Sequence, residues 1–279
     1  VNGKTSKLLF SRKLFIILVI ITISFISSAE DGELSPPTFS KDSGFYSEEF
    51  SLTLSSSDED VKIFYTTDSS DPTISTTAKE YTSPIKIKDR TEEPNIYSDY
   101  GEDENDPLSV SRAGYNKPVY PVDKAMIVRA VAIKSKVPSK IVSKTYFVTS
   151  DALKIYQDLT VISIVTNPEN LFDPDHGIYV VGNQFIEWKN SPEFDPNKNP
   201  YLLDNKCNYF GKGKEWEKES YVTFFDKGEI ILERDFGLRL QGSSTRNNPG
   251  KSFELVPRKN GKKEQLINNK LLPNNLNIK

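Results

Sequence analysis

The residues of this chain that could do chemistry gather in one short stretch, LRLQGSSTRNNPGKSFEL, at residues 238–255. It places two basic residues, Arg246 and Lys251, beside a run of Gly, Ser and Thr. A guanidinium can hold a phosphate through two hydrogen bonds, and an ammonium adds a compact positive charge. The stretch therefore indicates either a loop that binds phosphate or a polar hairpin between two strands.

The pattern alone favours the hairpin. The run Gly242-Ser243-Ser244-Thr245 matches neither the phosphate loop GxxxxGK(S/T) nor the kinase loop GxGxxG. Apolar residues alternate with polar ones on both sides of the run, which is the period of half-buried strands. On the residues alone, Arg246 and Lys251 are therefore read as part of a solvated hairpin.

Other catalytic residues are scarce. His176 is the single histidine and stands in the turn-rich sequence Asp173–Gly177, so we expect an exposed turn residue rather than a catalytic base. The same turn lacks the spacing of a calcium loop. Cys207 is the single cysteine, which excludes a disulfide within the chain and a cysteine-based metal cluster. We therefore predict no catalytic residue and no metal ligand in this chain.

The first 29 residues have the pattern of a signal peptide. Four basic residues precede an apolar run at 14–26, and small residues follow at 27–29. The run is short for a membrane span, which takes about 20 residues. We expect a secreted or cell-surface protein, which would contact a membrane only if this segment stays uncleaved as an anchor.

Charge argues against nucleic acid as the main partner. Four of the 36 basic residues lie in the signal segment and all 39 acidic residues follow it, so the rest of the chain carries 32 basic against 39 acidic residues. Binding to nucleic acid generally requires a basic face. The chain begins at Val1, its one methionine is Met126, and it stops within an Asn/Lys-rich stretch, so we expect a fragment.

Residues 30–150 predict a small β-sandwich. Five short segments alternate with period two or are continuously apolar, and turn residues separate them. These segments are 50–54, 61–65, 85–87, 126–132 and 141–147. Between residues 88 and 124 the strand pattern is absent, and the stretch is acidic and rich in Asp, Glu, Tyr and Pro. We interpret it as an extended surface insertion.

The string IFYTTDSSDPT, residues 63–73, closely resembles the module found at the C-terminus of chitobiases and β-hexosaminidases, also called fibronectin-type-III-associated. The flanking PPTFSKDSGFYSEEFSLTL and the late VRAVA extend the resemblance, although the family usually has Gly in place of Ser69. We expect Asp68 and Asp71 to bond nearby backbone N–H groups in a turn, rather than to contact a sugar or a metal. The resemblance implies a module that accompanies other domains and is not an enzyme.

Residues 151–279 predict a second β-rich domain. Strands are expected at 159–165, 178–181, 221–225, 229–233, 236–240 and 252–256. One helical turn is expected at 169–173, a long loop or short helices at 182–214, and a three-residue hairpin connection at Asp226-Lys227-Gly228. The fold class is therefore mainly β: a small sandwich followed by a β-rich domain.

The sequences LTVISIVTNPENLFDPDHGIYVVG and WEKESYVTFFDKGEIILERDFGLRLQGSSTRNNPGKSFEL resemble the entry region of the CotH family of spore-coat-type, secreted kinase-like proteins. The similarity covers residues 159–256, with Gly250 where the family often has a second Lys. It implies an α+β kinase-like fold that uses ATP and a divalent metal, Mg²⁺ or Mn²⁺, to phosphorylate protein serines. By this resemblance Lys251 and Arg246 become candidate nucleotide-binding residues.

The family's metal-binding and catalytic acids would follow residue 256, where this chain has one acidic residue, Glu264. We therefore expect residues 151–279 to be an incomplete kinase-like N-terminal lobe that transfers no phosphate alone and binds neither ATP nor metal tightly. The partner would be a protein substrate or a component of a cell or spore surface. The alternative is a non-enzymatic surface or carbohydrate-associated binding protein, in which Trp188 and Trp216 would stack on polysaccharide instead of serving as partly buried anchors.

Overall fold

The computed structural model describes residues 33–102, 117–195, 197, 206–259 and 262–263. The chain separates into a leading unit, Val1–Gly32, and a second unit, Glu33–Lys279, to which all described residues belong. The expected signal peptide, residues 1–29, lies outside the described residues. Within the described ranges, no helix is both long and apolar enough to span a bilayer.

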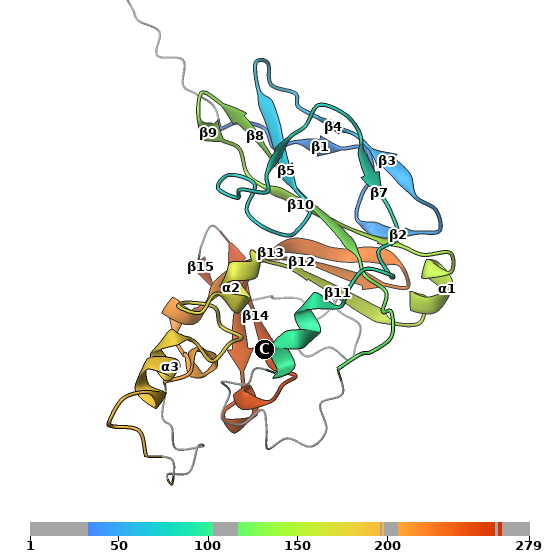
Figure 1. Cartoon of the computed structure of the whole chain (residues 1–279). Coiled ribbons are helices and arrows are strands. Elements are labelled where there is room, and N and C mark those ends of the chain that lie inside the picture. The colour runs from blue at the N-terminus through green and yellow to red at the C-terminus, as the bar shows by residue number, and fades with distance from the viewer. Residues whose placement is uncertain (1–32, 103–116, 196, 198–205, 260–261, 264–279) are drawn as a thin grey trace, which may run out of the picture. The chain divides into compact units, whose positions relative to one another are not determined.

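The described residues are mainly β, as the sequence predicts, and the first half is built from short strands (Figure 1). They are β1 (Thr38–Phe39), β2 (Gly44–Tyr46), β3 (Phe50–Leu52), β4 (Leu54–Ser55), β5 (Lys62–Thr66), β6 (Lys79–Glu80), β7 (Ile85–Ile87), β8 (Met126–Lys134), β9 (Val137–Pro138) and β10 (Val142–Val148). The main sheet has the order β2-β10-β8-β5-β6 with β9 paired to β8, and the pairs β1-β4 and β3-β7 complete the set.

The two faces of the central strand β8 have different surroundings. Met126, Val128 and Ala130 point into the sandwich core, where they meet Leu52 and Ile87. The alternate residues of β8 must then lie on the opposite face of the sheet, because side chains of a strand alternate with period two. That opposite face, which carries Arg129, is available to pack against other elements.

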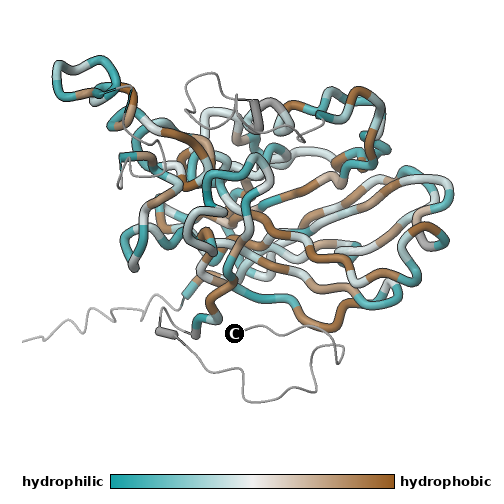
Figure 2. Tube along the Cα trace, turned by 90° about the horizontal axis from the view of Figure 1, so that it is seen from below, coloured by the Kyte–Doolittle hydropathy of each residue, from teal (hydrophilic) through white to brown (hydrophobic). Residues whose placement is uncertain are grey.

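A second sheet follows in the chain, with the order β11-β12-β13-β14-β15. Its strands are β11 (Thr160–Val165), β12 (Lys218–Asp226), β13 (Glu229–Gln241), β14 (Ser252–Lys259) and β15 (Lys262–Lys263). Short helices occur before and between them: α1 (Ala152–Tyr156), α2 (Pro168–Phe172), α3 (Asn183–Lys189), η4 (Asn208–Phe210), η5 (Lys214–Trp216) and η6 (Ser244–Asn247). Figure 2 shows that hydrophobic residues follow the strands while the turns are largely hydrophilic.

The hairpin between β12 and β13 is tighter than the sequence predicts. Asp226 pairs with Glu229, so the connection has two residues, Lys227 and Gly228, rather than three. Both have positive φ, 53° and 83°, which the primed hairpin turns require and Gly adopts without strain. The segments expected at 229–233 and 236–240 are one continuous strand, with an irregularity in the register at Phe224 and Phe225 of β12.

The expected strand at residues 178–181 is wrong. Ile178 and Val181 are buried in a core cluster, but the backbone N–H groups of Ile178 and Tyr179 donate to carbonyls of Asn170 and Leu171 at 3.0 and 2.8 Å. Carbonyls of helix α2 therefore accept the backbone hydrogen bonds that a neighbouring strand would otherwise have accepted. Helix α2 itself and the short helices within 182–214 agree with the sequence.

Residues 103–116 of the acidic insertion lie outside the described residues. The described part of the insertion is more structured than the extended loop that the sequence predicts. Its 3₁₀ helix η1 (Ile96–Glu102) brings Tyr97 and Tyr100 onto the ring of Phe172, with centroids 5.2 and 3.9 Å apart. The Tyr156 hydroxyl donates to Asp123 Oδ2 at 2.8 Å. The insertion therefore contacts elements of the second half, and aromatic stacking is one of the forces that hold it there.

The second sheet packs on the outer face of the β2-β10-β8 sheet, and the contact changes character along the strands. At one end Phe45, Phe147 and Phe225 form an aromatic cluster, with ring centroids 4.9 to 6.3 Å apart. In the middle, the buried hydroxyls of Thr145 and Ser163 lie 2.8 Å apart. At the other end the two sheets leave a cleft.

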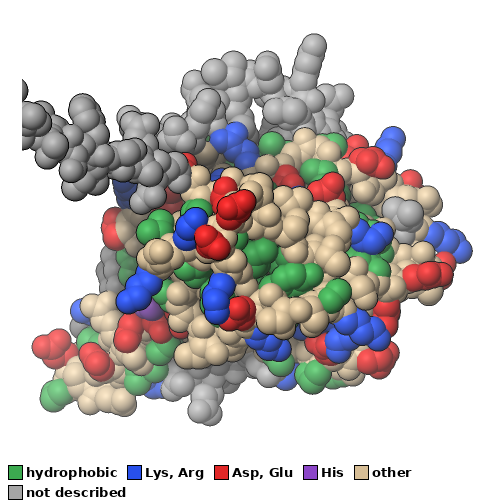
Figure 3. Space-filling model, turned by 90° about the horizontal axis from the view of Figure 1, so that it is seen from above, with side chains coloured by type: hydrophobic (Ala, Val, Ile, Leu, Met, Phe, Trp, Pro, Cys, Tyr) green, Lys and Arg blue, Asp and Glu red, His purple; other side chains and the backbone are tan. Residues whose placement is uncertain are grey.

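The face of the molecule shown in Figure 3 has its acidic and basic side chains interspersed.

Candidate functional site

The loop at residues 242–251 is a hairpin, as the sequence predicts, but it is not solvated throughout, because Arg246 and Asn247 are buried. Gln241 of β13 pairs with Ser252 of β14, and η6 occupies the middle of the loop. Gly242 has φ +109°, and a Cβ at this position would collide with Thr245 Oγ1. The loop therefore needs Gly at its first position, both for its backbone conformation and for the close approach of Thr245.

Arg246 holds this loop together. Its side chain is 8% exposed, its Nε donates to the Gly242 carbonyl at 2.8 Å, and its Nη1 donates to the Gly211 carbonyl at 2.6 Å. Burial lowers the pKa of Arg246, and the nearby charge of Glu254 offsets part of this effect. Arg246 could bind a phosphate through these two nitrogens only after both hydrogen bonds were broken. The structure therefore gives Arg246 the role of an anchor for the loop.

Lys251 lies at the start of β14 with its ammonium over two tyrosine rings. The Nζ is 4.4 Å from the ring centroid of Tyr209, 5.0 Å from that of Tyr179, and 3.0 Å from the Asn248 carbonyl oxygen. The Tyr179 hydroxyl donates to the Pro249 carbonyl at 2.7 Å, which ties the loop to the same ring. Cation–π contacts keep an ammonium charged while fixing its place. Lys251 is therefore a positioned cation at the exit of the loop.

The loop supplies charge but no metal ligands. Among the described residues, no group of three or more His, Cys, Asp or Glu side chains could hold a metal ion. His176 lies in an exposed turn and its Nδ1 is 2.8 Å from Asp173 Oδ1, as expected of a turn residue. The residues at hand therefore suit contact with an anion at Lys251 and do not fit a metal-binding role.

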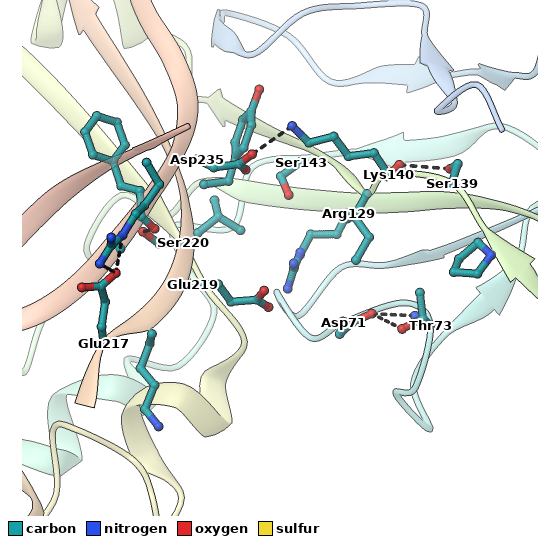
Figure 4. A pocket seen from close by; sticks show the side chains of 18 of the residues that line it. Asp71, Thr73, Arg129, Ser139, Lys140, Ser143, Glu217, Glu219, Ser220 and Asp235 are labelled. Atoms are coloured by element: carbon teal, nitrogen blue, oxygen red, sulfur yellow. Dashed lines mark hydrogen bonds and ion pairs between the residues drawn. The ribbon is translucent and has the colours of Figure 1, made fainter. Parts of the chain in front are cut away.

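The cleft between the two sheets is the second candidate site (Figure 4). It has a volume of about 590 Å³, which lies within the range of small-molecule sites. One wall comes from the turn after β5, from β8 and from the segment 138–143; the other comes from β12, β13 and β14. Both basic and acidic residues line the cleft. Two groups of these charged residues lie around Arg129 and around Glu217.

Arg129 of β8 is the most buried cation of the cleft. It is 7% exposed; Nη1 donates to the Ser69 carbonyl at 2.9 Å, and Nε is buried without a hydrogen-bond partner among the described residues. Figure 4 shows its side chain between Glu219 of the second sheet and Asp71 of the turn after β5. Burial lowers the pKa of Arg129, and the charges of Asp71 and Glu219 act in the opposite direction.

Glu217 forms the second group, with two arginines of the second sheet. Arg239 Nε and Arg258 Nε each donate to a different carboxylate oxygen at 2.6 Å, and each arginine adds a second contact through Nη2. Partial burial would raise the pKa of Glu217, but the hydrogen bonds from Arg258 and Arg239 outweigh it and the pKa is lowered. Gly237 permits this packing, because a Cβ there would collide with the Glu217 carboxylate. Glu217 is therefore neutralised within the protein.

The turn that resembles the known module agrees with the sequence prediction. Asp68 Oδ1 accepts from Ser70 N at 3.0 Å, and Asp71 Oδ1 accepts from Thr73 N at 2.8 Å. Ser69 has φ +69°, which explains on steric grounds why Gly suits this position. The Arg129 bond to the Ser69 carbonyl anchors this turn over the cleft.

Comparison with known proteins supports the first module. Residues 52–146 match the model of a protein family described as Fn3 associated. No curated protein and no solved structure matches the chain. Residues 52–146, which run from the end of β3 into β10, are therefore a fibronectin-type-III-associated β-sandwich module, and they include Asp68, Asp71 and Arg129.

Sequence reasoning missed Arg129, Glu217, Arg239 and Arg258. A signal for Arg129 existed: it is the one charged residue within the apolar run Met126–Ala132, and a charge in a buried strand calls for a partner. The Glu217 group gave no such signal, because its arginines lie 22 and 41 residues further along the chain. Trp188 and Trp216 pack against the core cluster of the second half, which confirms the expectation of partly buried anchors.

Proposed function

We propose that this chain is the N-terminal part of a secreted, CotH-like protein kinase, in which the loop at residues 242–251 contacts the nucleotide. The observation that carries the proposal is the position of the Lys251 ammonium over two tyrosine rings, at the exit of a hairpin loop that Arg246 and Tyr179 anchor. The resemblance of residues 159–256 to the family supplies the expected ligand, ATP, and the expected acceptor, protein serine.

In this proposal Lys251 places a positive charge on the nucleotide phosphates. Phosphoryl transfer depends mainly on positioning and charge neutralisation, and a strand-borne lysine after a covering turn serves both needs. The rings of Tyr179 and Tyr209 lie under Nζ and fix the position of the ammonium at the exit of the loop. Arg246 supports Lys251 indirectly, by fixing the loop to Gly211 and Gly242.

A divalent metal would supply further charge neutralisation when bound with ATP. The described residues do not fit such a metal, so no step of transfer is assigned to them and the role of this chain is limited to contact with the nucleotide. The Fn3-associated module would then present the kinase-like sheet at a cell or spore surface. The two halves share a buried aromatic cluster, which suits a module that holds its neighbour in a fixed orientation.

Binding of a fluorescent ATP analogue in the presence of Mn²⁺ tests the proposal. Lys251→Met should weaken binding at least tenfold, which is about 1.4 kcal/mol. Lys227→Met removes an exposed lysine from the turn at the other end of β13 and should leave the affinity within twofold. Equal effects of the two substitutions, or a wild-type chain that binds no nucleotide, would contradict the proposed role.

Arg246→Met separates anchoring from direct contact. If Arg246 anchors the loop, this substitution should lower the thermal stability together with nucleotide affinity, whereas Lys251→Met should lower affinity with little change in the melting temperature. The reverse pattern would assign the phosphate contact to Arg246.

A further inference from the structure

The buried guanidinium of Arg129 is incompletely satisfied by the protein. Among its nitrogens, Nη1 bonds to the Ser69 carbonyl, while the buried Nε has no partner among the described residues. Asp71 and Glu219 influence it through charge, yet neither forms an ion pair with it. A buried charge is normally paired, and a buried donor without a hydrogen-bond partner destabilises the protein. Arg129 therefore lies at the cleft with hydrogen-bonding capacity that the protein does not use.

The rest of the cleft limits what could occupy it. Five basic and four acidic residues line it, so the lining carries one net positive charge. Four of these nine charges are paired with one another: Lys140 with Asp235 at 2.9 Å, and Arg258 with Glu217. The carboxylates left beside Arg129 are those of Glu219 and Asp71, of which Asp71 Oδ1 already accepts from Thr73. A ligand of one negative charge would match the lining.

The two remaining carboxylates add a further requirement. Carboxylates only accept hydrogen bonds, so a ligand that brings a carboxylate alone would be repelled by Glu219 and Asp71. A ligand that carries hydroxyl groups beside its carboxylate would place the carboxylate on Arg129 and donate its hydroxyl protons to these two side chains. A zwitterion could also donate to them, but it would leave the positive charge of the lining uncompensated.

We propose that the cleft around Arg129 is a binding site for a small hydroxylated monocarboxylate of the sugar-acid type. The guanidinium takes the ligand's carboxylate in a charge-assisted contact, and Glu219 and Asp71 accept from its hydroxyl groups. The volume of about 590 Å³ accommodates a ligand of this size. The proposal is independent of nucleotide binding at Lys251, which lies outside the lining of this cleft.

Titration of the purified chain with D-glucuronate tests this site, with D-glucose and glycine as the uncharged and zwitterionic comparisons. Saturable binding of glucuronate, at least tenfold tighter than that of glucose and glycine, is the expected result. Glycine binding as tightly as glucuronate would overturn the assignment of a hydroxylated monoanion. Absence of glucuronate binding would overturn the site.

Substitutions then locate the binding. Arg129→Lys keeps the charge but loses the forked geometry, and it should weaken glucuronate binding at least tenfold; an unchanged affinity would overturn the role of Arg129. Lys140→Glu reverses an exposed charge at the cleft and should weaken binding several-fold at low salt. Lys86→Glu is the matched control, because Lys86 is also largely exposed and ion-paired, to Glu49, but lies outside the cleft.

The control keeps the test decisive if Arg129→Lys does not fold. In that case the affinities of Lys140→Glu and Lys86→Glu for glucuronate are compared. Both variants make the same change of charge at an exposed position, so a difference between them locates the binding. A selective effect of Lys140→Glu supports the site. Equal effects of the two would show that only the overall charge of the chain matters, and would overturn the proposal.

Discussion

The two ends of the interface between the sheets differ although the same strands build both. Along β10, the residues on the interface face change from Phe147 through Thr145 to Ser143. Along β12, they change from Phe225 to Glu219 in the same direction. The aromatic end is closed and buried, whereas the polar end is open and contains the cleft.

The change from aromatic to polar residues gives the two ends of the sheet interface different properties. Aromatic side chains bury large apolar areas and stabilise the contact without a binding partner. Ser143 and Glu219 fill less space and leave charges near Arg129, so the sheets cannot close there without burying polar groups at a cost. The comparison shows that stability and binding capacity lie at opposite ends of the same pair of strands.

The largest effect is expected at the closed end. Phe225→Ala removes a fully buried ring that contacts Phe45 and Phe147, and truncation of a buried Phe typically costs about 3–5 kcal/mol. Urea unfolding should show this loss. Ile230→Ala is the control, because Ile230 pairs with Phe225 in the hairpin but is exposed, and it should cost less than about 1 kcal/mol. Similar costs would contradict the central role of the aromatic cluster.

A smaller effect is expected at the open end. Glu217→Gln leaves Arg239 and Arg258 without their carboxylate, and breaking such a pair costs about 3 kcal/mol when it is well buried, less where the arginines are partly exposed. The exposed Glu215→Gln should stay within about 0.5 kcal/mol in the same urea experiment. A cost for Glu217→Gln as small as that of the control would show that the charged group is dispensable.

The pH dependence of this effect follows from the lowered pKa of Glu217. Its contribution to stability is complete above the ordinary pKa of a glutamate, about 4.3, and is lost as pH falls through the lower pKa of the folded state. The difference in stability between wild type and Glu217→Gln should therefore shrink as pH falls below about 4. A difference that grows on acidification would contradict the direction of the shift.

Local features of both ends could be predicted from the sequence. Alternation at residues 61–65 and 141–147 predicts β5 and β10 to within one residue, because half-buried strands depend on near neighbours in sequence. The Asp68 and Asp71 turn is predictable for the same reason, since its hydrogen bonds span two residues. The candidate loop at 242–251 was also found as a hairpin.

The charged cleft could not be predicted, since it depends on contacts between distant strands. Glu217 meets Arg258 only because β12, β13 and β14 pair in register, and Arg129 meets Glu219 only because the two sheets pack. The failed strand at 178–181 has a related cause: its apolar pattern signals burial correctly, but the backbone partners are carbonyls of Asn170 and Leu171. Burial can be read from residue types, whereas the choice of partner cannot.

The smallest effect is expected midway, where Thr145 and Ser163 share one buried hydrogen bond between the sheets. Thr145→Val and Ser163→Ala should each cost about 1 kcal/mol, since each leaves the other hydroxyl without this partner. The double variant should cost less than the sum, because no hydroxyl is then left unsatisfied, and a double-mutant cycle from urea unfolding measures this coupling. Additive costs would mean that each hydroxyl has another partner, and that the sheets at this point are held by shape rather than by the bond. Non-additive costs would instead show that the hydrogen bond between Thr145 and Ser163 contributes to the contact between the sheets. The polar part of the interface would then begin at Thr145, between the aromatic cluster and the cleft.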